Sequence, residues 1–437
     1  MKTFYLETHG CQMNDHDSER MAGLMEIAGY HRVVTPDEAD VAILNTCAIR
    51  ENADNKLYGH LGALKPIKER TGLKIAVGGC QAEKDREGVR QRAPWVDVVF
   101  GTRNIDALPR LVQAVDEAGV PLVEFAEQFE VHPSALPARR ESSFHAWVAI
   151  QYGCNNACTF CIVPSVRGHE VSRPLGEIVG EVKRLVDDGV TEVSLLGQNV
   201  NSYGRDLTGR PIFSELLYAV NDVPGVRRIR YTSPHPKDFK EDTARAMAEC
   251  DAVCEHLHFP VQSGSDSVLR RMRRAYSRAS YLDKVAMARE TIPGLALTTD
   301  VIVGFPAETD AEFDETMSLV ERVRYDGAFM FQYSKRPGTD AATMDDQVDK
   351  HVVQERFERL LKTQEHISRE RNETLVGSTV ELTIERTSSK KDEAKITGRT
   401  RTNKLVHLAP GELSVGDVVT ARITDARAHH LVGRLCS

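Results

Sequence analysis

The chain has 437 residues, a formal net charge of -8 and a pI near 6.0. This length predicts about three domains, and the acidic balance excludes nucleic-acid binding through bulk positive charge, so RNA contact would require local basic patches. No stretch has the apolar length of a membrane span or a signal-peptide core, so we expect a cytoplasmic protein whose nine cysteines are metal ligands or inert thiols rather than disulfides.

Residues 1–130 alternate short apolar runs with helical patterns. Strands are expected at Lys2–Leu6, Asp40–Leu44, Leu73–Val77 and Val96–Phe100. Helices are expected near Asp15–Ala28, Ile49–Arg70, Ala82–Arg92 and Asn104–Glu117. Alternation of this kind predicts an α/β domain with a doubly wound parallel sheet.

Three cysteines follow strands of this predicted sheet, namely Cys11, Cys47 and Cys80. Loops at the carboxyl ends of parallel strands gather at one edge. We therefore expect three thiolates to meet there and to hold a metal cluster that leaves one iron without a protein ligand. A single cysteine at such a place is more often a core thiol, but three at equivalent positions weaken that interpretation.

A linker is predicted at 131–143, where Pro133, Pro137, Arg139 and Arg140 interrupt the pattern. Six further strands are expected at Ala146–Gln151, Glu192–Leu196, Arg228–Thr232, His256–Pro260, Leu297–Val303 and Ala328–Tyr333. The helices between them are expected at Glu177–Asp187, Phe213–Val220, Asp238–Glu249, Tyr281–Glu290 and Ala311–Val323. Six strand–helix units over 144–372 predict a partial (βα)6 barrel, whose chemistry lies at the carboxyl ends of the strands.

The segment after the first of these strands reads QYGCNNACTFCIVPSVRGHEVSR (151–173) and holds Cys154, Cys158 and Cys161. Iron–sulfur clusters are normally held by four cysteines. Three thiolates from one loop would leave one iron without a protein ligand, and an open coordination position is typical of catalytic metal sites. A structural zinc site is an alternative, with His169 as the nearby fourth ligand. Buried thiols without metal are another, although a loop with Gly and Asn makes a poor apolar core.

The spacing of these three cysteines, with the aromatic and apolar residues that follow, resembles the radical S-adenosylmethionine superfamily. The resemblance implies that the amino and carboxylate groups of S-adenosylmethionine chelate the open iron. Cofactor contacts are expected from Gln198, Asn199, Ser233 and Gln262, which follow later strands, from Asp300, which marks the fifth of the six strands, and from Arg173 beside the cysteine loop. For each of them, a hydrogen bond that only shapes a loop is the alternative.

A second resemblance lies in the segments THGCQMN (8–14), DSE (17–19), NTCAIRENA (45–53) and GGC (78–80). They are similar to the N-terminal domain of the methylthiotransferases, and the residues after Cys11 and Cys47 resemble the MiaB type, which modifies a tRNA adenosine next to the anticodon. The resemblance implies two [4Fe-4S] clusters, a radical generator on the 151–173 segment and a sulfur donor on the N-terminal cysteines. The implied activity is methylthiolation at C2 of N6-isopentenyl (dimethylallyl) adenosine.

The last part of the chain changes from the charged helix Lys350–Glu373 to short alternating strands. These are expected at Thr379–Glu385, Glu393–Arg399, Leu405–Leu408, Val418–Ala426 and Leu431–Leu435. Five such strands in 373–437 predict a small β-barrel. TGRTRTNKLV (397–406) and GDVVTARITDA (416–426) resemble a TRAM domain, an RNA-binding barrel whose basic face would be Arg399, Arg401 and Lys404. A stabilising cap without RNA contact is the alternative.

RNA contact is also predicted for Arg270 and Arg271 in the basic run 269–278, although such a run is commonly a solvated face. The expected partners are the anticodon stem-loop of tRNA, an electron donor such as a flavodoxin or ferredoxin, and a sulfur source, for an enzyme that acts as a monomer. Two other functions stay open, methylthiolation of an aspartate in a small-subunit ribosomal protein and a non-enzymatic zinc-containing RNA-binding protein. Cys250, Cys254 and Cys436 are not expected to be ligands.

Overall fold

The computed structural model describes residues 1–48, 53–128, 132–387 and 396–436. Its chain forms two compact units, the first comprising Met1–Glu141, Trp147–Asn156 and Cys161–Val171, and the second Ser142–Ala146, Ala157–Phe160 and Ser172–Ser437. Among the described residues, no helix is both long and apolar enough to cross a membrane. Expectations that fall on 49–52, 129–131 and 388–395, including the IRE motif after Cys47, lie outside the described residues.

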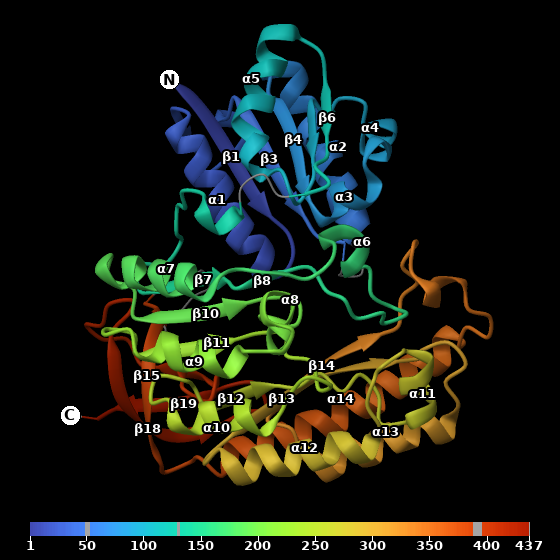
Figure 1. The fold of residues 1–437 in the computed structure, drawn as a ribbon, viewed down its shortest axis with the longest axis vertical. Helices are drawn as coiled ribbons and strands as arrows, with labels where there is room; N and C mark the ends of the chain where they lie inside the picture. The colour runs from blue at the N-terminus through green and yellow to red at the C-terminus, as the bar shows by residue number, and fades with distance from the viewer. Residues whose placement is uncertain (49–52, 129–131, 388–395, 437) are drawn as a thin grey trace. The chain divides into compact units, whose positions relative to one another are not determined.

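The first unit is built on a six-stranded parallel sheet with helices on both faces (Figure 1). The strands are β1 (Lys2–Thr8), β2 (Tyr30–Arg32), β3 (Val41–Thr46), β4 (Lys74–Gly79), β5 (Val98–Phe100) and β6 (Leu122–Glu124), in the order β2-β1-β3-β4-β5-β6. The helices are α1 (Gln12–Ile27), α2 (Ala53–Thr71), α3 (Cys80–Asp85), α4 (Glu87–Arg92), α5 (Leu108–Ala118) and α6 (Val163–Arg167). The predicted doubly wound sheet is confirmed.

Two differences from the predicted elements have local causes. The strands β2 and β6 were not expected, because a three-residue strand is too short to show an alternating pattern. The single helix expected at Ala82–Arg92 is wrong, since the chain breaks into α3 and α4 at Arg86, whose φ is +46°.

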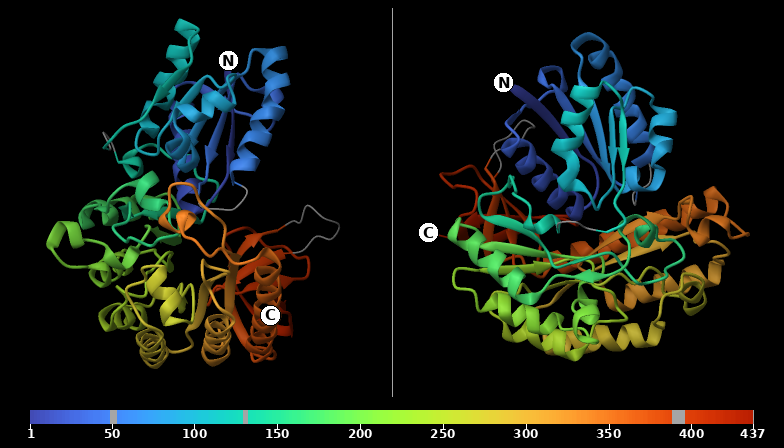
Figure 2. Two further views of the ribbon diagram at one scale, coloured as in Figure 1. Left: turned by 90° about the vertical axis from the view of Figure 1, so that its right-hand side faces the viewer. Right: turned by 45° about the horizontal axis from the view of Figure 1, so that its top comes forward.

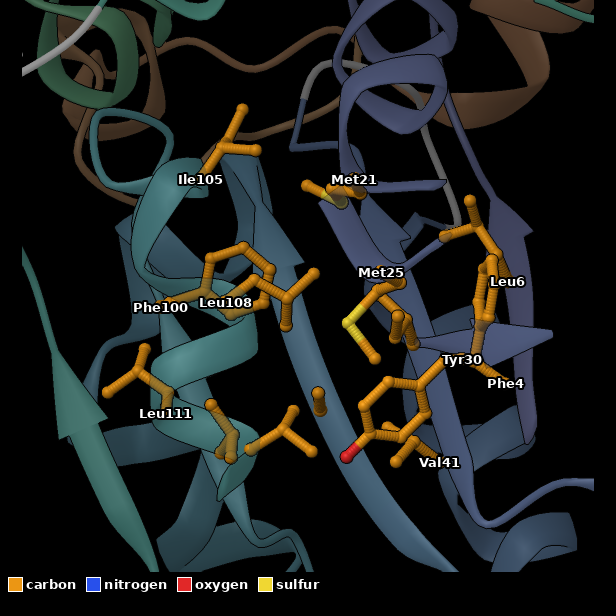
Figure 3. Close-up of a cluster of buried hydrophobic side chains, with 14 of the residues drawn as sticks. Phe4, Leu6, Met21, Met25, Tyr30, Val41, Phe100, Ile105, Leu108 and Leu111 are labelled. Carbon is orange, nitrogen blue, oxygen red and sulfur yellow. The ribbon is translucent and has the colours of Figure 1, made fainter. Parts of the chain in front are cut away.

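Two apolar cores cover the two faces of this sheet. One lies between the sheet and the helices α1 and α5, where Phe4, Met25, Phe100 and Leu111 are almost fully buried (Figure 3). The other packs Leu61 of α2 and its neighbours against the opposite face. Because both faces are covered, β3 is buried along its whole length, as is usual for strands of parallel sheets.

The second unit contains most of a parallel α/β region. Its strands are β7 (His145–Ala149), which begins in this unit, β10 (Glu192–Leu196), β11 (Arg228–Tyr231), β12 (His256–His258), β13 (Ala296–Val303) and β14 (Gly327–Gln332). The short strands β8 (Gln151–Tyr152) and β9 (Val171–Ser172) flank the cysteine loop. The six predicted strands are confirmed, and they form two three-stranded sheets, β11-β10-β7 and β12-β13-β14.

The helices of this unit are α7 (Leu175–Asp187), α8 (Arg205–Thr208), α9 (Phe213–Asn221), α10 (Glu241–Glu249), α11 (Asp266–Arg271), α12 (Arg278–Thr291), α13 (Asp310–Val323) and α14 (Lys350–Glu373). Helices α12, α13 and α14 lie along one side of the β12-β13-β14 sheet (Figures 1 and 2).

The C-terminal residues form the predicted closed β-barrel. Its strands are β15 (Thr379–Arg386), β16 (Ile396–Thr400), β17 (Leu405–Leu408), β18 (Val418–Ala426) and β19 (Leu431–Leu435), in the order β15-β16-β17-β19-β18. Leu382, Ile384, Val406 and Leu431 are fully buried inside it.

Candidate cluster and cofactor sites

Three thiols of the first unit lie at the carboxyl ends of neighbouring strands. Cys11 precedes the first residue of α1, Cys47 directly follows β3, and Cys80 is the first residue of α3 directly after β4. Since β1, β3 and β4 are adjacent in the sheet, the loops that carry the cysteines meet at one edge. The structure brings these residues together, and their role as cluster ligands stays a prediction.

Asn14 lies beside two of the thiols and is fully buried. Its Oδ1 is 3.8 Å from Cys11 Sγ and 3.9 Å from Cys80 Sγ. Its Nδ2 donates hydrogen bonds of 2.9 Å to the backbone oxygens of His9 and Thr46. These bonds join α1 to the loops after β1 and β3, so Asn14 fixes the spacing of the cysteine-bearing segments.

The chain just before Cys80 requires a glycine. Gly79 has a φ of +90°, and a Cβ there would lie 2.4 Å from Asn45 Oδ1 and 2.5 Å from the backbone oxygen of Thr46. A side chain would therefore clash as well as strain the backbone. The close approach of β4 to β3 at this point sets the position of Cys80.

A buried ion pair lies against the same thiols. Arg167, at the end of α6, is 4% exposed, and Asp17 of α1 is 1% exposed. Arg167 Nη1 donates to Asp17 Oδ2 at 2.7 Å and Nη2 donates to Asn14 Oδ1 at 3.1 Å. Its Nε donates to Cys80 Sγ at 3.2 Å. In the sequence, Arg167 lies in the segment 151–173 with the other three cysteines, and nothing there indicates its contact with Cys80.

Burial and this ion pair act in opposite directions on the acidity of the thiols. Burial raises the pKa of Cys80 to about 12, although the Arg167 guanidinium favours the thiolate. Burial also raises the pKa of Cys11. Burial opposes the ionisation of Asp17, but Arg167 and the neighbouring His16 together outweigh it, and the pKa of Asp17 is lowered. A cluster bound by these thiols would therefore have to displace their protons, next to the fixed positive charge of Arg167.

The spacing of the three cysteines does not suit a single ion. Within the described residues, the only three potential ligand side chains whose donor atoms all lie within 4.8 Å of one another are Glu7, His9 and His60. That trio is already joined by a hydrogen bond of 3.1 Å between His60 Nδ1 and Glu7 Oε2. Cys11, Cys47 and Cys80 are not such a trio, so at least one pair of their sulfurs lies more than 4.8 Å apart.

Backbone contacts shape the loop that begins at Cys154. The Cys154 N–H donates to the backbone oxygen of Gly168 at 3.0 Å. Its Sγ accepts hydrogen bonds of 3.4 Å from both the backbone and the side-chain nitrogen of Asn156, contacts that stabilise a thiolate. Gly153 has a φ of +75°, and a Cβ there would lie 2.0 Å from the backbone oxygen of His169, so only glycine fits.

Cys158 has a buried arginine as hydrogen-bond partner. Arg274 Nη1 donates to Cys158 Sγ at 3.3 Å, while Nη2 and Nε bond to the backbone oxygen of Pro260 and to Tyr276 Oη. Burial disfavours the charge of Arg274, but Tyr276 and Cys158 outweigh it and raise its pKa. A positive charge at this distance favours the thiolate form of Cys158. Sequence reasoning missed Arg274, because nothing in the basic run shows which arginine points inward.

Two of the predicted S-adenosylmethionine contacts carry oxygen atoms that lack a protein donor. Gln198 Oε1 and Asn199 Oδ1 are buried and have no hydrogen-bond partner among the described residues. Asp238 orients the Asn199 amide, accepting from its Nδ2 at 2.8 Å. An unpaired buried acceptor is costly, so both oxygens fit a ligand that carries amino or hydroxyl donors, as S-adenosylmethionine does.

The other predicted cofactor residues have varied surroundings. Ser233 is exposed with a φ of +59°, whereas Gln262 is buried with a φ of +68°. The Gln262 N–H donates to the backbone oxygen of Asp300 at 2.9 Å, so the segment after β12 is bonded to the interior of β13, where Asp300 lies. Arg173 Nη1 donates to the buried Glu181 Oε2 at 2.7 Å, so its charge is neutralised within the chain. Cofactor contact by these four residues stays a prediction.

Four of the five predicted RNA-binding side chains form ion pairs within the chain. The pairs are Arg399–Glu385 at 2.6 Å, Arg401–Glu255 at 2.7 Å, Lys404–Asp326 at 2.9 Å and Arg271–Glu312 at 2.9 Å. Arg270, in contrast, is exposed. The paired groups offer less net charge to a phosphate, and RNA contact by all five stays a prediction.

Arg401 also donates to the backbone oxygens of Asp251 and Val253 at 2.9 and 2.8 Å, which joins the barrel to the segment before β12. We expect Arg401→Ala to lower the free energy of unfolding by about 1–3 kcal/mol, because two carbonyls and a carboxylate lose a charged donor. Arg270→Ala is the matched control and should change it by less than about 0.5 kcal/mol. Urea unfolding measures both, and equal stability of the two variants would contradict this role of Arg401.

Comparison with known protein families gives three matches along the chain. Residues 3–101 match the Uncharacterized protein family UPF0004, residues 148–320 the Radical SAM superfamily and residues 373–436 the TRAM domain. The radical SAM match implies a [4Fe-4S] cluster and S-adenosylmethionine as cofactors, which removes the zinc-protein alternative.

Among solved structures, the radical S-adenosylmethionine methyltransferase TsrM from Kitasatospora setae has a TM-score of 0.58 at 15% identity, covering 78% of this chain and 74% of that chain. The cobalamin-dependent enzyme OxsB has a TM-score of 0.54 at 13% identity, covering 84% of this chain and 56% of that one. Likeness at these identities shows the fold alone.

Curated relatives are much more similar. The tRNA-2-methylthio-N(6)-dimethylallyladenosine synthase of Salinispora arenicola is 53% identical, covering 98% of this chain and 87% of the relative. The protein of the same name from Mycobacterium bovis is 52% identical, covering 99% of this chain and 86% of the relative. By identity over nearly its whole length, the chain belongs to the family of tRNA-2-methylthio-N(6)-dimethylallyladenosine synthases, the MiaB-type methylthiotransferases of the radical SAM superfamily.

Proposed function

We propose that the protein methylthiolates C2 of N6-dimethylallyladenosine next to the anticodon of tRNA, using S-adenosylmethionine and two [4Fe-4S] clusters. The observation that carries the proposal is the gathering of Cys11, Cys47 and Cys80 at one sheet edge, in a chain that separately has a radical SAM cysteine loop. An enzyme that only generated radicals would not need a second set of thiols. The names of the relatives and the TRAM match support tRNA as the substrate.

Each cluster would have its own cysteines, Cys154, Cys158 and Cys161 for one and the N-terminal three for the other. Bound cofactors would supply the radical that breaks an unactivated C–H bond and the sulfur that replaces the hydrogen, chemistry that side chains lack. The chain's part is to position them.

Two arginines and two amide side chains would position the clusters and S-adenosylmethionine. Arg274 and Arg167 each hold a positive charge within 3.3 Å of a ligand sulfur, which stabilises the thiolate form. The oxygens of Gln198 and Asn199 would accept hydrogen bonds from S-adenosylmethionine and fix its orientation. Bound in this way, the cofactor meets polar groups that are already oriented.

The reaction also requires partners. A one-electron donor of the flavodoxin or ferredoxin type would reduce the radical-generating cluster, and a sulfur source would restore the second cluster after each turnover. The protein would act as a monomer on the anticodon stem-loop. Arg270, Arg271 and the barrel residues Arg399, Arg401 and Lys404 are the proposed phosphate contacts.

The test is a nucleoside assay on reconstituted protein. The enzyme, S-adenosylmethionine and a reductant are incubated with tRNA that carries dimethylallyladenosine, and the digested nucleosides are identified by mass spectrometry. We expect the adenosine next to the anticodon to gain one methylthio group. Deuterium at C2 should pass from the substrate to 5′-deoxyadenosine, because the C2 hydrogen must be removed.

A parallel reaction with small ribosomal subunits provides the contrast. If a ribosomal aspartate were modified while the tRNA stayed unmodified, the proposed substrate would be overturned. Dimethylallyladenosine that stays unchanged while 5′-deoxyadenosine accumulates would overturn the sulfur insertion and leave a radical enzyme of another kind.

A further inference from the structure

Two exposed phenylalanines lie on one strand of the second unit. In β14, Phe329 is 63% and Phe331 is 49% exposed, and they are the only aromatic residues among the exposed large apolar side chains of the described chain. Being two residues apart on a strand, they point to the same face of the sheet. Exposed aromatic rings side by side indicate a binding surface.

Their face is the one that the helices leave free. In the parallel pairing, Phe329 lies opposite Asp300 and Phe331 lies opposite Ile302, whereas the intervening Val301 is fully buried on the other face. Gln332 on that other face bonds to Gln354 of α14. The rings therefore lie on the face away from the helices, which in βα barrels is the interior.

Polar groups border the rings. His258 Nε2 lies 3.3 Å from Asp300 Oδ1, and its Nδ1 lies 3.0 Å from Thr298 Oγ1. The rings of His258 and Phe329 meet edge to face, with centroids 5.9 Å apart. The surface thus combines two aromatic faces with a carboxylate and an imidazole along one side.

This combination fits a purine with an apolar arm better than a charged ligand. Proteins recognise unpaired RNA bases by stacking them on aromatic side chains and by hydrogen bonds to their edges. The N6–H of a substituted adenine is a donor that a carboxylate accepts, and a dimethylallyl group gains from contact with apolar side chains. The two phenylalanine rings carry no positive charge and no hydrogen-bond donor, so they offer a phosphate group no favourable contact.

We propose that Phe329 and Phe331 form the surface that receives the target adenine together with its apolar N6 substituent. The inference rests on the proposed tRNA activity and adds the residues that make the enzyme select the dimethylallylated base. Phe329 stacks on the base or its arm next to His258 and Asp300, and Phe331 extends the apolar surface toward the carboxyl end of β14.

The experiment uses the reconstituted holoenzyme and two anticodon stem-loop RNAs, identical except for the dimethylallyl group. Binding is measured by fluorescence anisotropy, and KM and kcat by methylthio product. We expect Phe329→Ala with Phe331→Ala to weaken binding of the dimethylallylated RNA about tenfold or more, as loss of base–aromatic contacts does. The unmodified RNA should be much less affected, so that discrimination between the two is largely lost. Phe329→Trp should retain it.

Leu207→Ala is the matched control, because Leu207 is an exposed apolar residue of the same unit, 49% exposed in α8. It should bind both RNAs like the wild type. Iron content and cleavage of S-adenosylmethionine without RNA verify that each variant is intact. Unchanged discrimination in the intact double variant overturns the inference, and so does equal weakening for both RNAs. A wild-type enzyme that binds the dimethylallylated RNA selectively but never transfers a methylthio group overturns the proposed function instead.

Discussion

Alanine at Cys154, Cys158 and Cys161 together is expected to abolish cleavage of S-adenosylmethionine, while the same change at Cys11, Cys47 and Cys80 leaves cleavage intact and abolishes only methylthio transfer. The reason is that each set of thiols would hold a different cluster. Wild-type protein reconstituted without oxygen should contain about eight irons and each triple variant about four, one cubane per set of three cysteines.

The measurement combines iron and acid-labile sulfide analysis with chromatography of 5′-deoxyadenosine. Cys250→Ala with Cys254→Ala is the matched control, because both residues are buried cysteines that are not expected to be ligands. It should retain the iron and both activities. If the N-terminal triple variant kept all of its iron, those thiols would not hold a cluster, and the proposed sulfur insertion would be lost with them.

The positions of the cysteines in both sets could be predicted from the sequence. The positions of Cys11, Cys47 and Cys80 were predictable, because an alternating strand–helix pattern shows which residues follow strands, and parallel strands bring those positions to one edge. The spacing of Cys154, Cys158 and Cys161 depends on local separation along one loop, so it can be read directly from the sequence, while their role as ligands stays a prediction.

Contacts of long side chains were not predictable in the same way. The basic run 269–278 contains Arg274, which turns inward to Cys158, and Arg270, which is exposed. The amino-acid type alone does not show which of the two arginines is buried. Arg401 and Lys404 were expected to face RNA, yet each bonds to a carboxylate from a distant part of the chain. The direction of a flexible charged side chain depends on partners that only the tertiary fold supplies.

Arg167 is the strongest example, because its partner Asp17 lies 150 residues earlier in the chain. We expect Arg167→Leu to lower the free energy of unfolding by about 3–5 kcal/mol, since it leaves the Asp17 carboxylate buried without its counter-charge. Arg167→Leu with Asp17→Leu should cost less than the sum of the single changes, because no charge is then left unpaired. Urea unfolding of the four proteins gives the coupling energy.

The surface pair Arg70–Asp37 provides the matched cycle, with side chains 63% and 55% exposed. Its coupling energy should be at most about 1 kcal/mol, the value usual for exposed ion pairs. A coupling between Arg167 and Asp17 no larger than that of this surface pair would show that burial does not strengthen their interaction.

Arg167→Lys separates the charge of this residue from its geometry. Lysine retains the positive charge but lacks the planar fork that reaches Asp17, Asn14 and Cys80 at once. The variant should fold, lose the hydrogen bond to Cys80 Sγ, and give the second cluster a more negative reduction potential, because hydrogen bonds to ligand sulfur raise that potential. Titration monitored by electron paramagnetic resonance, in protein that also lacks Cys154, Cys158 and Cys161, reports on this cluster alone. An unchanged potential would restrict Arg167 to holding α6 against α1, and a shifted one would make it a positioning residue of the sulfur-donor site.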